Sequence, residues 1–283
     1  MDLALRFAAE AEARGVRVLA LKGVSIAEEL YGSIDQRPMA DIDFLVVDTQ
    51  GFEEAVRLAR HMGLVETGAS DHALVFKEPA SGVILELHIS LTACPGLFSI
   101  DHEALWRRRA AVTSSPSIAR LGNADLVTHL ALHTAFQHGF AANAFHYGDF
   151  VRAIERWRPL ASTFTESSRS AGAHTAIAAM ARACSKRFPD SGLVRDLAHD
   201  VSAQCPAALG RWIDAWPEMP PRASVTALAF VRFQLAPSKG RYIAHSLFPA
   251  VIPGRTTPRS HAMRRILNVI DAGWTLPVKR NPL

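Results

Sequence analysis

The chain has 283 residues, of which 49% are hydrophobic and 20% are charged, and its formal net charge is +4. This composition is typical of a globular chain that buries a substantial core, and it excludes intrinsic disorder. No apolar run reaches the roughly 18 residues that span a bilayer, and three widely spaced cysteines exclude a disulfide framework or a zinc ribbon.

The chain begins with a helical pattern over residues 2–14, and Gly15 ends this helix as a C-terminal cap would. Acidic residues distinguish this amphipathic segment from a signal peptide. Together with the cysteine usage, the N-terminus predicts a cytoplasmic protein that has neither disulfides nor a membrane partner.

The segment up to residue 90 alternates between helix and strand patterns. Predicted helices cover residues 2–14, 24–31 and 52–61, and predicted strands cover residues 16–21, 41–47, 72–77 and 83–90. Pro38, in the loop before the second strand, pushes Arg37 into extended geometry. This run of elements predicts a small mixed sheet with helices.

From residue 102 onward, helical patterns dominate. Predicted helices or helix fragments cover residues 102–109, 124–139, 144–157, 164–187, 191–204, 207–215, 223–235 and 259–272. The loop-like residues 113–117 predict a boundary between a segment 1–112 and a segment 113–283. We therefore expect an α+β fold in which an N-terminal sheet core is followed by a C-terminal α-helical domain.

Two acidic residues occupy alternate positions of one predicted strand. Asp41 and Asp43 face one side of it, whereas Ile42 and Phe44 face the other. Two carboxylates held this close repel each other unless a cation lies between them. Glu86, on another predicted strand, supplies a third carboxylate, and three oxygen ligands on adjacent strands suit Mg²⁺. The alternative is three acidic residues that face solvent.

Lys22 and Gly23 lie between a predicted strand and a predicted helix. A glycine at this point allows a close approach to the backbone, and the N–H groups that open the helix are well matched to a phosphate. Lys22 adds a positive charge and Ser25 adds a hydroxyl. A simple turn glycine is the alternative interpretation.

Two further polar residues near these motifs each have two interpretations. Arg37 either holds phosphate oxygens or forms a salt bridge to Asp35 or Asp41. His88 shares a strand face with Glu86, and it lies either at the rim of the site or among packed and hydrogen-bonded residues.

Histidines gather in the helical half. His129 and His133 share one helix face, with His138 and His146 nearby, and this spacing can hold zinc. No glutamate or cysteine pair accompanies them, which favours residues that line a cleft or the edge of the core. Asp149, in the next predicted helix, is interpreted as a cap, a salt-bridge residue or a cleft contact.

The C-terminal segment is basic. From Arg255 onward, six basic residues accompany one acidic residue, Asp271. This pattern predicts either a surface that faces phosphate or RNA, or a solvated helix with a basic face.

Taken together, these residues resemble the bacterial family of uncharacterised nucleotidyltransferases, within the polymerase-beta-like superfamily. The resemblance rests on Leu21-Lys22-Gly23, Tyr31, the segment from Arg37 to Asp43, Glu86-Leu87-His88, and the helix that carries His129 and His133. It is specific over residues 16–90 and loose over residues 113–283. The chain departs from the superfamily pattern at Val24, where a second glycine or a serine is usual. The 17 residues between Gly23 and Asp41 are also a longer separation than is usual for the superfamily.

The resemblance implies an enzyme that transfers a nucleoside monophosphate from a nucleoside triphosphate, with ATP as the expected nucleotide, and releases pyrophosphate. Asp41 and Asp43 would hold two Mg²⁺ ions, and Glu86 would complete one metal site and favour deprotonation of the acceptor. The residues expected to hold the phosphates are Lys22, Gly23, Ser25 and Arg37, and those expected to line the cleft are His88, His129, His133 and Asp149.

Three functions stay open at this point. The first is tailoring of a ribosomal peptide, of the lasso type, or of a small molecule at a hydroxyl or phosphate. The second is a toxin-like enzyme that modifies tRNA, with the basic C-terminal segment as its RNA surface. The third is an inactive nucleotide-binding or regulatory module, against which three clustered acidic residues count.

Overall fold

The structure is a computed structural model that describes residues 1–158, 168–215 and 225–248. The predicted helix 259–272, the basic C-terminal segment and the start of the predicted helix 164–187 lie outside the described residues. Within the described ranges, no helix is both long and apolar enough to cross a membrane, and the three cysteines are free thiols.

A seven-stranded mixed sheet forms the N-terminal part of the fold, with strand order β3-β4-β5-β2-β1-β7-β6. The strands are β1 (Val18–Leu21), β2 (Asp41–Val46), β3 (Val65–Ala69), β4 (Ala73–Lys77), β5 (Ile84–His88), β6 (Ala110–Val112) and β7 (Ser115–Arg120). The central strand β2 runs antiparallel to β1 and parallel to β5. Two strands from separate parts of the sequence therefore flank the acidic residues of β2.

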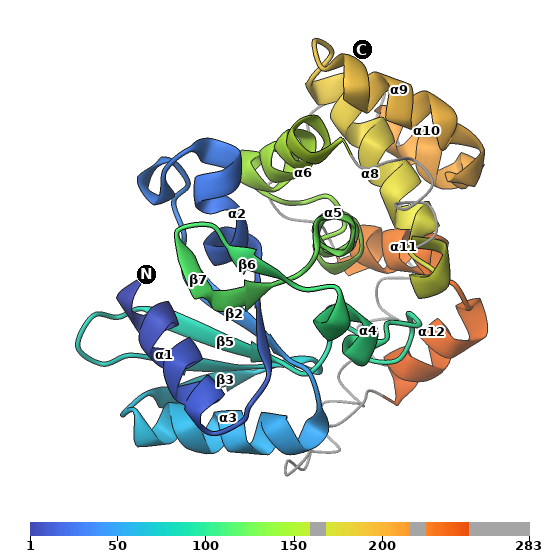
Figure 1. The fold of residues 1–283 in the computed structure, drawn as a ribbon. Coiled ribbons are helices and arrows are strands. Elements are labelled where there is room, and N and C mark those ends of the chain that lie inside the picture. Colours follow the sequence, from blue (N-terminus) through green and yellow to red (C-terminus); the bar gives the residue numbers. More distant parts are fainter. Residues whose placement is uncertain (159–167, 216–224, 249–283) are drawn as a thin grey trace, which may run out of the picture.

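The two faces of the sheet have different coverings (Figure 1). The helices α1 (Asp2–Ala13) and α3 (Thr49–His61) lie on one face, where Phe7 and Phe52 pack in the same core cluster as Ile42 and Phe44 of β2. The opposite face carries Leu45 into the core shared with the helical part. Because strand side chains alternate, Asp41 and Asp43 face the helical part.

The remaining helices form the second part of the fold. They are α2 (Lys22–Tyr31), α4 (His102–Arg107), α5 (Asn123–Ala131), α6 (Ala144–Trp157), α8 (His174–Arg187), α9 (Gly192–Asp200), α10 (Ala207–Ala215), α11 (Val225–Leu235) and α12 (Lys239–Leu247), together with the 3₁₀ turns η1 (Ile34–Gln36) and η3 (Ser202–Gln204) and the π-helical turn η2 (Leu132–Gln137). One continuous apolar cluster runs from the sheet face through α5 and α6 to α8 and α11. The sheet and the helices thus share a core.

The structure confirms the predicted α+β class, with a mixed sheet followed by helices. Among the described strands and α-helices, four have no counterpart in the sequence predictions: β3, β6, β7 and α12. β3 contains a glycine and has no buried residue, and β7 opens with Ser115-Pro116-Ser117, so both lack the apolar alternation of a typical strand.

The expected boundary at residues 113–117 coincides with a hairpin. Thr113 and Ser114 form its turn, and the following strand β7 pairs with β6 and with β1 inside the sheet. A loop over all of 113–117 is therefore wrong. We keep the division of the chain into a sheet part and a helical part as a proposal, and the pairing of β7 favours a division after Arg120.

The start of α5 provides a test of how closely the two parts are packed. A Cβ atom at Gly122 would lie 2.5 Å from the carbonyl oxygen of Arg108, which is a backbone atom. We expect Gly122→Ala to lower the free energy of unfolding by about 1–3 kcal/mol, because one chain or the other must shift. Urea denaturation followed by circular dichroism measures this change.

Gly240 in α12 is the matched control, since a Cβ there would have no heavy-atom neighbour within 4 Å. Gly240→Ala should raise the free energy of unfolding by about 0.5–1 kcal/mol through helix propensity. Equal stability of Gly122→Ala and the wild type would contradict the close approach at Arg108.

Candidate active site

The pairing of β1, β2 and β5 brings together residues that lie far apart in the sequence. Asp43 is in register with Glu86 on one side and with Leu21 on the other. Lys22 follows Leu21 directly, so its side chain starts beside the two acidic residues. We call Lys22, Asp41, Asp43, Glu86 and His88 the acidic cluster.

Two basic groups contact the same carboxylate oxygen. Lys22 Nζ lies 2.7 Å from Asp43 Oδ1, and His88 Nε2 donates to the same oxygen at 2.9 Å. His88 Nε2 also lies 3.4 Å from Glu86 Oε2. The side chain of Asp43 is only 1% exposed, and that of His88 only 2% exposed. His88 is thus a buried, hydrogen-bonded residue at the centre of the cluster.

Burial and charge compete in setting the ionisation of the cluster. Burial acts to raise the pKa of Asp43, but the charge of Lys22 and the hydrogen bond from His88 outweigh it and hold this pKa below its usual range. Burial acts to lower the pKa of Lys22, but the charges of Asp43 and Asp41 raise it. Asp43 is therefore a carboxylate and Lys22 an ammonium at neutral pH.

The surroundings of Asp41 shift its pKa in the opposite direction to that of Asp43. No described residue forms a hydrogen bond or ion pair with its carboxylate. Burial raises the pKa of Asp41, and the negative charge of Asp43 raises it further. A cation next to Asp41 would relieve this repulsion.

The carboxylate oxygens of the acidic cluster fit a hard divalent cation. Both contacts of Asp43 are made by Oδ1, so its Oδ2 takes part in neither. That oxygen, the carboxylate of Asp41 and the carboxylate of Glu86, which is 26% exposed, belong to one face of two adjacent strands. A set of carboxylate oxygens of this kind matches the ligand preference of Mg²⁺.

Lys22 is the first residue of α2 and has a positive φ of 46°. This left-handed conformation is unfavourable for a residue with a side chain, by about 1–3 kcal/mol. Lys22 directly follows the end of β1, where the chain turns from strand into helix beside Asp43. The sequence motif Lys22-Gly23 is therefore the first turn of α2 itself, two residues before the predicted helix start.

The other residues expected to hold phosphates are already engaged. Gly23 lies against Met39, whose Sδ would be 2.6 Å from a Cβ atom at this position. The hydroxyl of Ser25 donates to the carbonyl oxygen of Lys22 at 2.7 Å and is buried. Their role in phosphate binding remains a proposal, and a phosphate at Gly23 would require Met39 to move.

Arg37 forms a salt bridge, but to neither of the partners considered from the sequence. Its Nε donates to Asp149 Oδ1 at 2.9 Å and its Nη2 to Asp149 Oδ2 at 2.6 Å. The hydroxyl of Tyr31 also donates to Asp149 Oδ1, at 2.6 Å. Asp149, on α6, is 1% exposed. This bidentate pair ties the loop before β2 to α6, so Asp149 is a salt-bridge residue rather than a cap.

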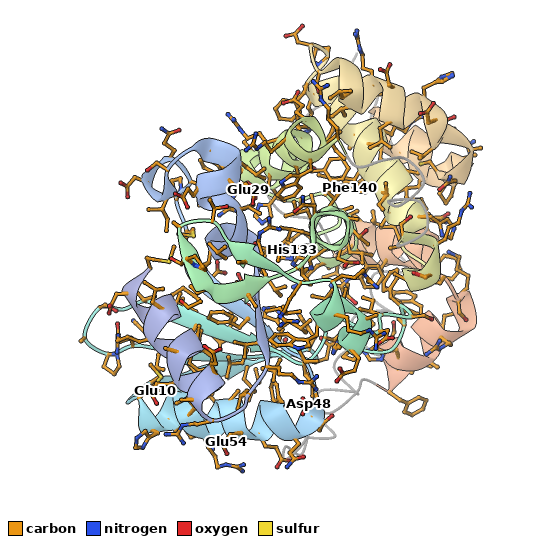
Figure 2. All side chains as sticks on the ribbon, in the orientation of Figure 1. Glu10, Glu29, Asp48, Glu54, His133 and Phe140 are labelled. Carbon is orange, nitrogen blue, oxygen red and sulfur yellow. The ribbon has the colours of Figure 1, made fainter. Side chains whose placement is uncertain are left out.

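The two predicted histidines occupy different surroundings. His129 is buried, and neither of its ring nitrogens has a hydrogen-bond partner among the described residues. His133 lies beside α5, between the sheet and the helical part (Figure 2), and its ring stacks on that of His146 with centroids 5.2 Å apart. Burial and the charge of Lys22 both lower the pKa of His129 and of His133, so both rings are neutral.

Sequence reasoning missed a polar chain that continues from the cluster. The ring of His72 lies 5.6 Å from that of His88, and its Nε2 is 3.0 Å from Gln137 Nε2 on η2. Asp71 Oδ1 is 2.8 Å from His72 Nδ1, and Asp71 Oδ2 is 3.2 Å from His245 Nε2 on α12. The adjacent polar pair Asp71-His72, directly before an apolar strand, was the signal available in the sequence.

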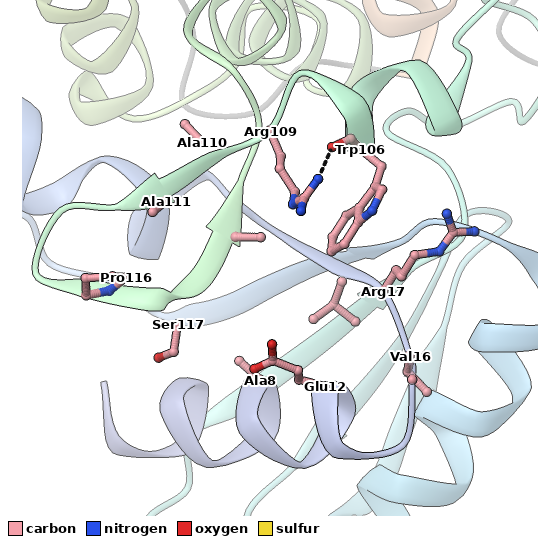
Figure 3. Close-up of a pocket in the computed structure, with 13 residues that line it drawn as sticks. Ala8, Glu12, Val16, Arg17, Trp106, Arg109, Ala110, Ala111, Pro116 and Ser117 are labelled. Atoms are coloured by element: carbon pink, nitrogen blue, oxygen red, sulfur yellow. Dashed lines mark hydrogen bonds between the residues drawn. The ribbon is translucent and has the colours of Figure 1, made fainter.

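A hollow lies elsewhere on the molecule. It has a volume of about 570 Å³ and lies between α1 and the β6–β7 hairpin, where Arg109 donates to the carbonyl oxygen of Trp106 (Figure 3). None of the residues that line it belongs to the acidic cluster. We therefore place the candidate site at the cluster.

Comparison with known proteins gives one family. A family model described as uncharacterised nucleotidyltransferase matches residues 3–189. The match extends from α1 through the whole sheet to α8. No curated protein and no solved structure matches the chain.

The burial of His129 predicts a defined pH dependence of stability. Burial lowers the pKa of His129 to about 3 in the folded protein, whereas the unfolded chain has a histidine pKa of about 6.5. Between these values the unfolded chain binds the extra proton, so stability is present above about pH 6.5 and is lost as the pH falls, by about 1.4 kcal/mol per pH unit for this ring.

His129→Leu removes this titration and the two unpartnered nitrogens. We expect its stability to fall less steeply than that of the wild type between about pH 6 and pH 4, measured by urea denaturation at several pH values. His61→Leu, at an exposed position of α3, should keep the wild-type slope. An unchanged slope in His129→Leu would show that His129 is protonated, or accessible, in the folded protein.

Proposed function

The chain belongs to the family of uncharacterised nucleotidyltransferases, and we propose that it transfers a nucleoside monophosphate from a nucleoside triphosphate to an acceptor hydroxyl or phosphate. Pyrophosphate is the leaving group. The observation that carries this proposal is the convergence of Asp41, Asp43 and Glu86 on one face of β2 and β5, beside the buried ammonium of Lys22.

We assign Mg²⁺ to the oxygens of Asp41, Asp43 and Glu86. Mg²⁺ held by these residues would supply positive charge that offsets the charge developing on the phosphates during transfer. The resemblance to the superfamily supports two ions. The carboxylate of Asp41 has no hydrogen bond or ion pair to a described residue, and burial and the charge of Asp43 raise its pKa despite the opposing charge of Lys22, which supports its part in the cation site.

The other members of the cluster orient and charge this site. Lys22 and His88 hold Asp43 in one orientation and keep it ionised through contacts with Oδ1. Glu86 is the more exposed carboxylate of the Asp43–Glu86 pair, so it is the one that an acceptor can reach and that can accept its proton. Arg37 Nη1 points at Gly23, 3.0 Å from the position of a Cβ there, and it is the group we assign to a phosphate oxygen at this turn.

ATP is the nucleotide we propose, and the hydroxyl or phosphate of a peptide or small molecule is the acceptor. The helical side of the site supports a compact acceptor. The rings of His129 and His133 are neutral there, and two of the three guanidinium nitrogens of Arg37, Nε and Nη2, are engaged by Asp149. An RNA backbone would favour a row of free Lys or Arg side chains. The basic segment on which the tRNA alternative rests lies outside the described residues.

The activity is tested by pyrophosphate release from each nucleoside triphosphate in the presence of Mg²⁺ and candidate acceptors. We expect Asp41→Asn and Asp43→Asn to lower this rate by at least about 100-fold. Each substitution removes a negatively charged ligand of the metal ion that would offset the charge of the phosphates. Mass spectrometry of the acceptors identifies the product.

Asp196→Asn is the matched control, because Asp196 is an exposed residue of α9. It should release pyrophosphate at the wild-type rate. Equal rates in Asp41→Asn and Asp196→Asn would contradict the assignment. Binding of ATP without turnover by the wild type, across all acceptors, would favour a regulatory module that binds nucleotides.

A further inference from the structure

Three histidines outside the acidic cluster meet at the end of α5. They are His133 in the π-helical turn η2, His138 directly after it, and His146 in the first turn of α6. One ring nitrogen of each lies within 4.8 Å of the others. We call these residues the histidine cluster.

The π-helical turn creates this cluster. The backbone N–H of His138 donates to the carbonyl oxygen of His133, five residues earlier, at 3.1 Å. Residues five apart therefore lie over each other, and His133 Nε2 and His138 Nε2 are 3.1 Å apart. In a regular α-helix the two side chains would diverge, because five residues exceed one turn of 3.6 by more than a third of a turn. Such π turns recur at functional sites.

The third ring is oriented by its own helix cap. Asn143 precedes α6, and its Oδ1 accepts from the backbone N–H groups of Phe145 and His146. The same oxygen lies 2.8 Å from His146 Nδ1. A proton on Nδ1 that is donated to Asn143 leaves the lone pair on Nε2, as in metal sites whose histidines donate their other N–H to an oxygen.

The spacing and chemistry of the three rings suit a metal site. Burial lowers the pKa of His133 and of His146, and it lowers the pKa of His138 to about 4, so each ring is neutral and has one lone pair. His133 and His138 share one proton in a hydrogen bond between their Nε2 atoms, and a metal ion would take the place of that proton. Three imidazoles around one tetrahedral Zn²⁺ place their nitrogens about 3.3 Å apart at a Zn–N distance of about 2.0–2.1 Å. The observed 3.1 Å separation of two of them is close to this spacing.

We propose that His133, His138 and His146 bind one Zn²⁺ ion, at a site separate from the three carboxylates. Nitrogen ligands favour zinc and other late first-row metals over Mg²⁺. Three protein ligands leave a fourth position open, as in catalytic zinc sites. His138 and His146 are only partly buried, so water or an anionic oxygen of a substrate can reach that position.

His129, which shares a helix face with His133, lies outside the histidine cluster. His129 and His133 have ring centroids 5.8 Å apart, and His129 does not belong to the cluster. The π-helical turn η2, which begins at Leu132, brings His138 rather than His129 next to His133 Nε2.

The test is a titration of the full chain, stripped of metal by a chelator, with Co²⁺ as a spectroscopic probe of zinc sites. We expect the visible absorption of tetrahedral coordination to saturate at one Co²⁺ per chain and to be abolished by one equivalent of Zn²⁺; Co²⁺ at the carboxylates would not contribute to this band. His138→Ala and His146→Ala should weaken this binding by at least about 10-fold. Circular dichroism checks that each variant is folded.

Two controls separate this site from others. His61→Ala, on α3, should bind Co²⁺ as the wild type does, and so should Asp43→Asn, which alters the acidic cluster. The proposal is overturned if the wild type shows no tetrahedral Co²⁺ band, if His138→Ala and His146→Ala both retain wild-type affinity, or if Asp43→Asn removes the band. Because the readout is metal binding, its failure leaves the proposed nucleotidyl transfer untouched.

Discussion

The ion pair between Lys22 and Asp43 is the constraint on which the site depends. Asp43 lies on the central strand of the sheet and is almost fully buried, so its negative charge requires a partner. The partner has to come from the end of β1, where the chain enters α2 through a residue with positive φ. Loss of one member of a buried pair costs about 3–5 kcal/mol when the other charge is left without compensation, and for loss of Lys22 the hydrogen bond from His88 to Asp43 offsets part of this cost. The start of α2 and the register of β1 on β2 therefore serve the same contact.

The charge on Asp43 also connects the sheet to the helices around it. His88 joins Asp43 to Glu86 and lies against His72, which reaches η2 through Gln137. On the other side, Arg37 and Tyr31 bind Asp149 of α6. The helical part is thus attached to the sheet through polar contacts at the site, in addition to the shared apolar core. A change in charge at the carboxylates, such as binding of a cation, acts on the same groups that position the helices. The contacts from His88 through His72 end at Gln137, and the same segment of the chain carries the histidine cluster.

Local patterns predicted the parts of this structure that depend on neighbours in the sequence. The alternation in β2 correctly placed Ile42 and Phe44 in the core under α1 and α3, and Asp43 on the opposite face. Pairings between distant segments were beyond such patterns. Arg37 and Asp149 are 112 positions apart, and the acidic residues next to Arg37 in the sequence were the wrong partners. The π turn that begins at Leu132 places His138 next to His133. The hydrophobic periodicity of the sequence does not predict this turn. β7 was missed because its serines and proline are typical of a loop, although it completes the sheet beside β1.

Lys22 and a cation bound by Asp41, Asp43 and Glu86 would both offset the negative charge of these three carboxylates. The most direct test compares the thermal unfolding of the wild type, Lys22→Met and the exposed control Lys77→Met, each with and without Mn²⁺ at one pH and ionic strength. Without metal, Lys22→Met should melt at the lowest temperature, because three carboxylates then face only His88. Mn²⁺ should raise the melting temperature of Lys22→Met by more than that of the wild type or Lys77→Met, because the ion replaces the missing ammonium. An equal or smaller gain in Lys22→Met would contradict a cation site at these carboxylates.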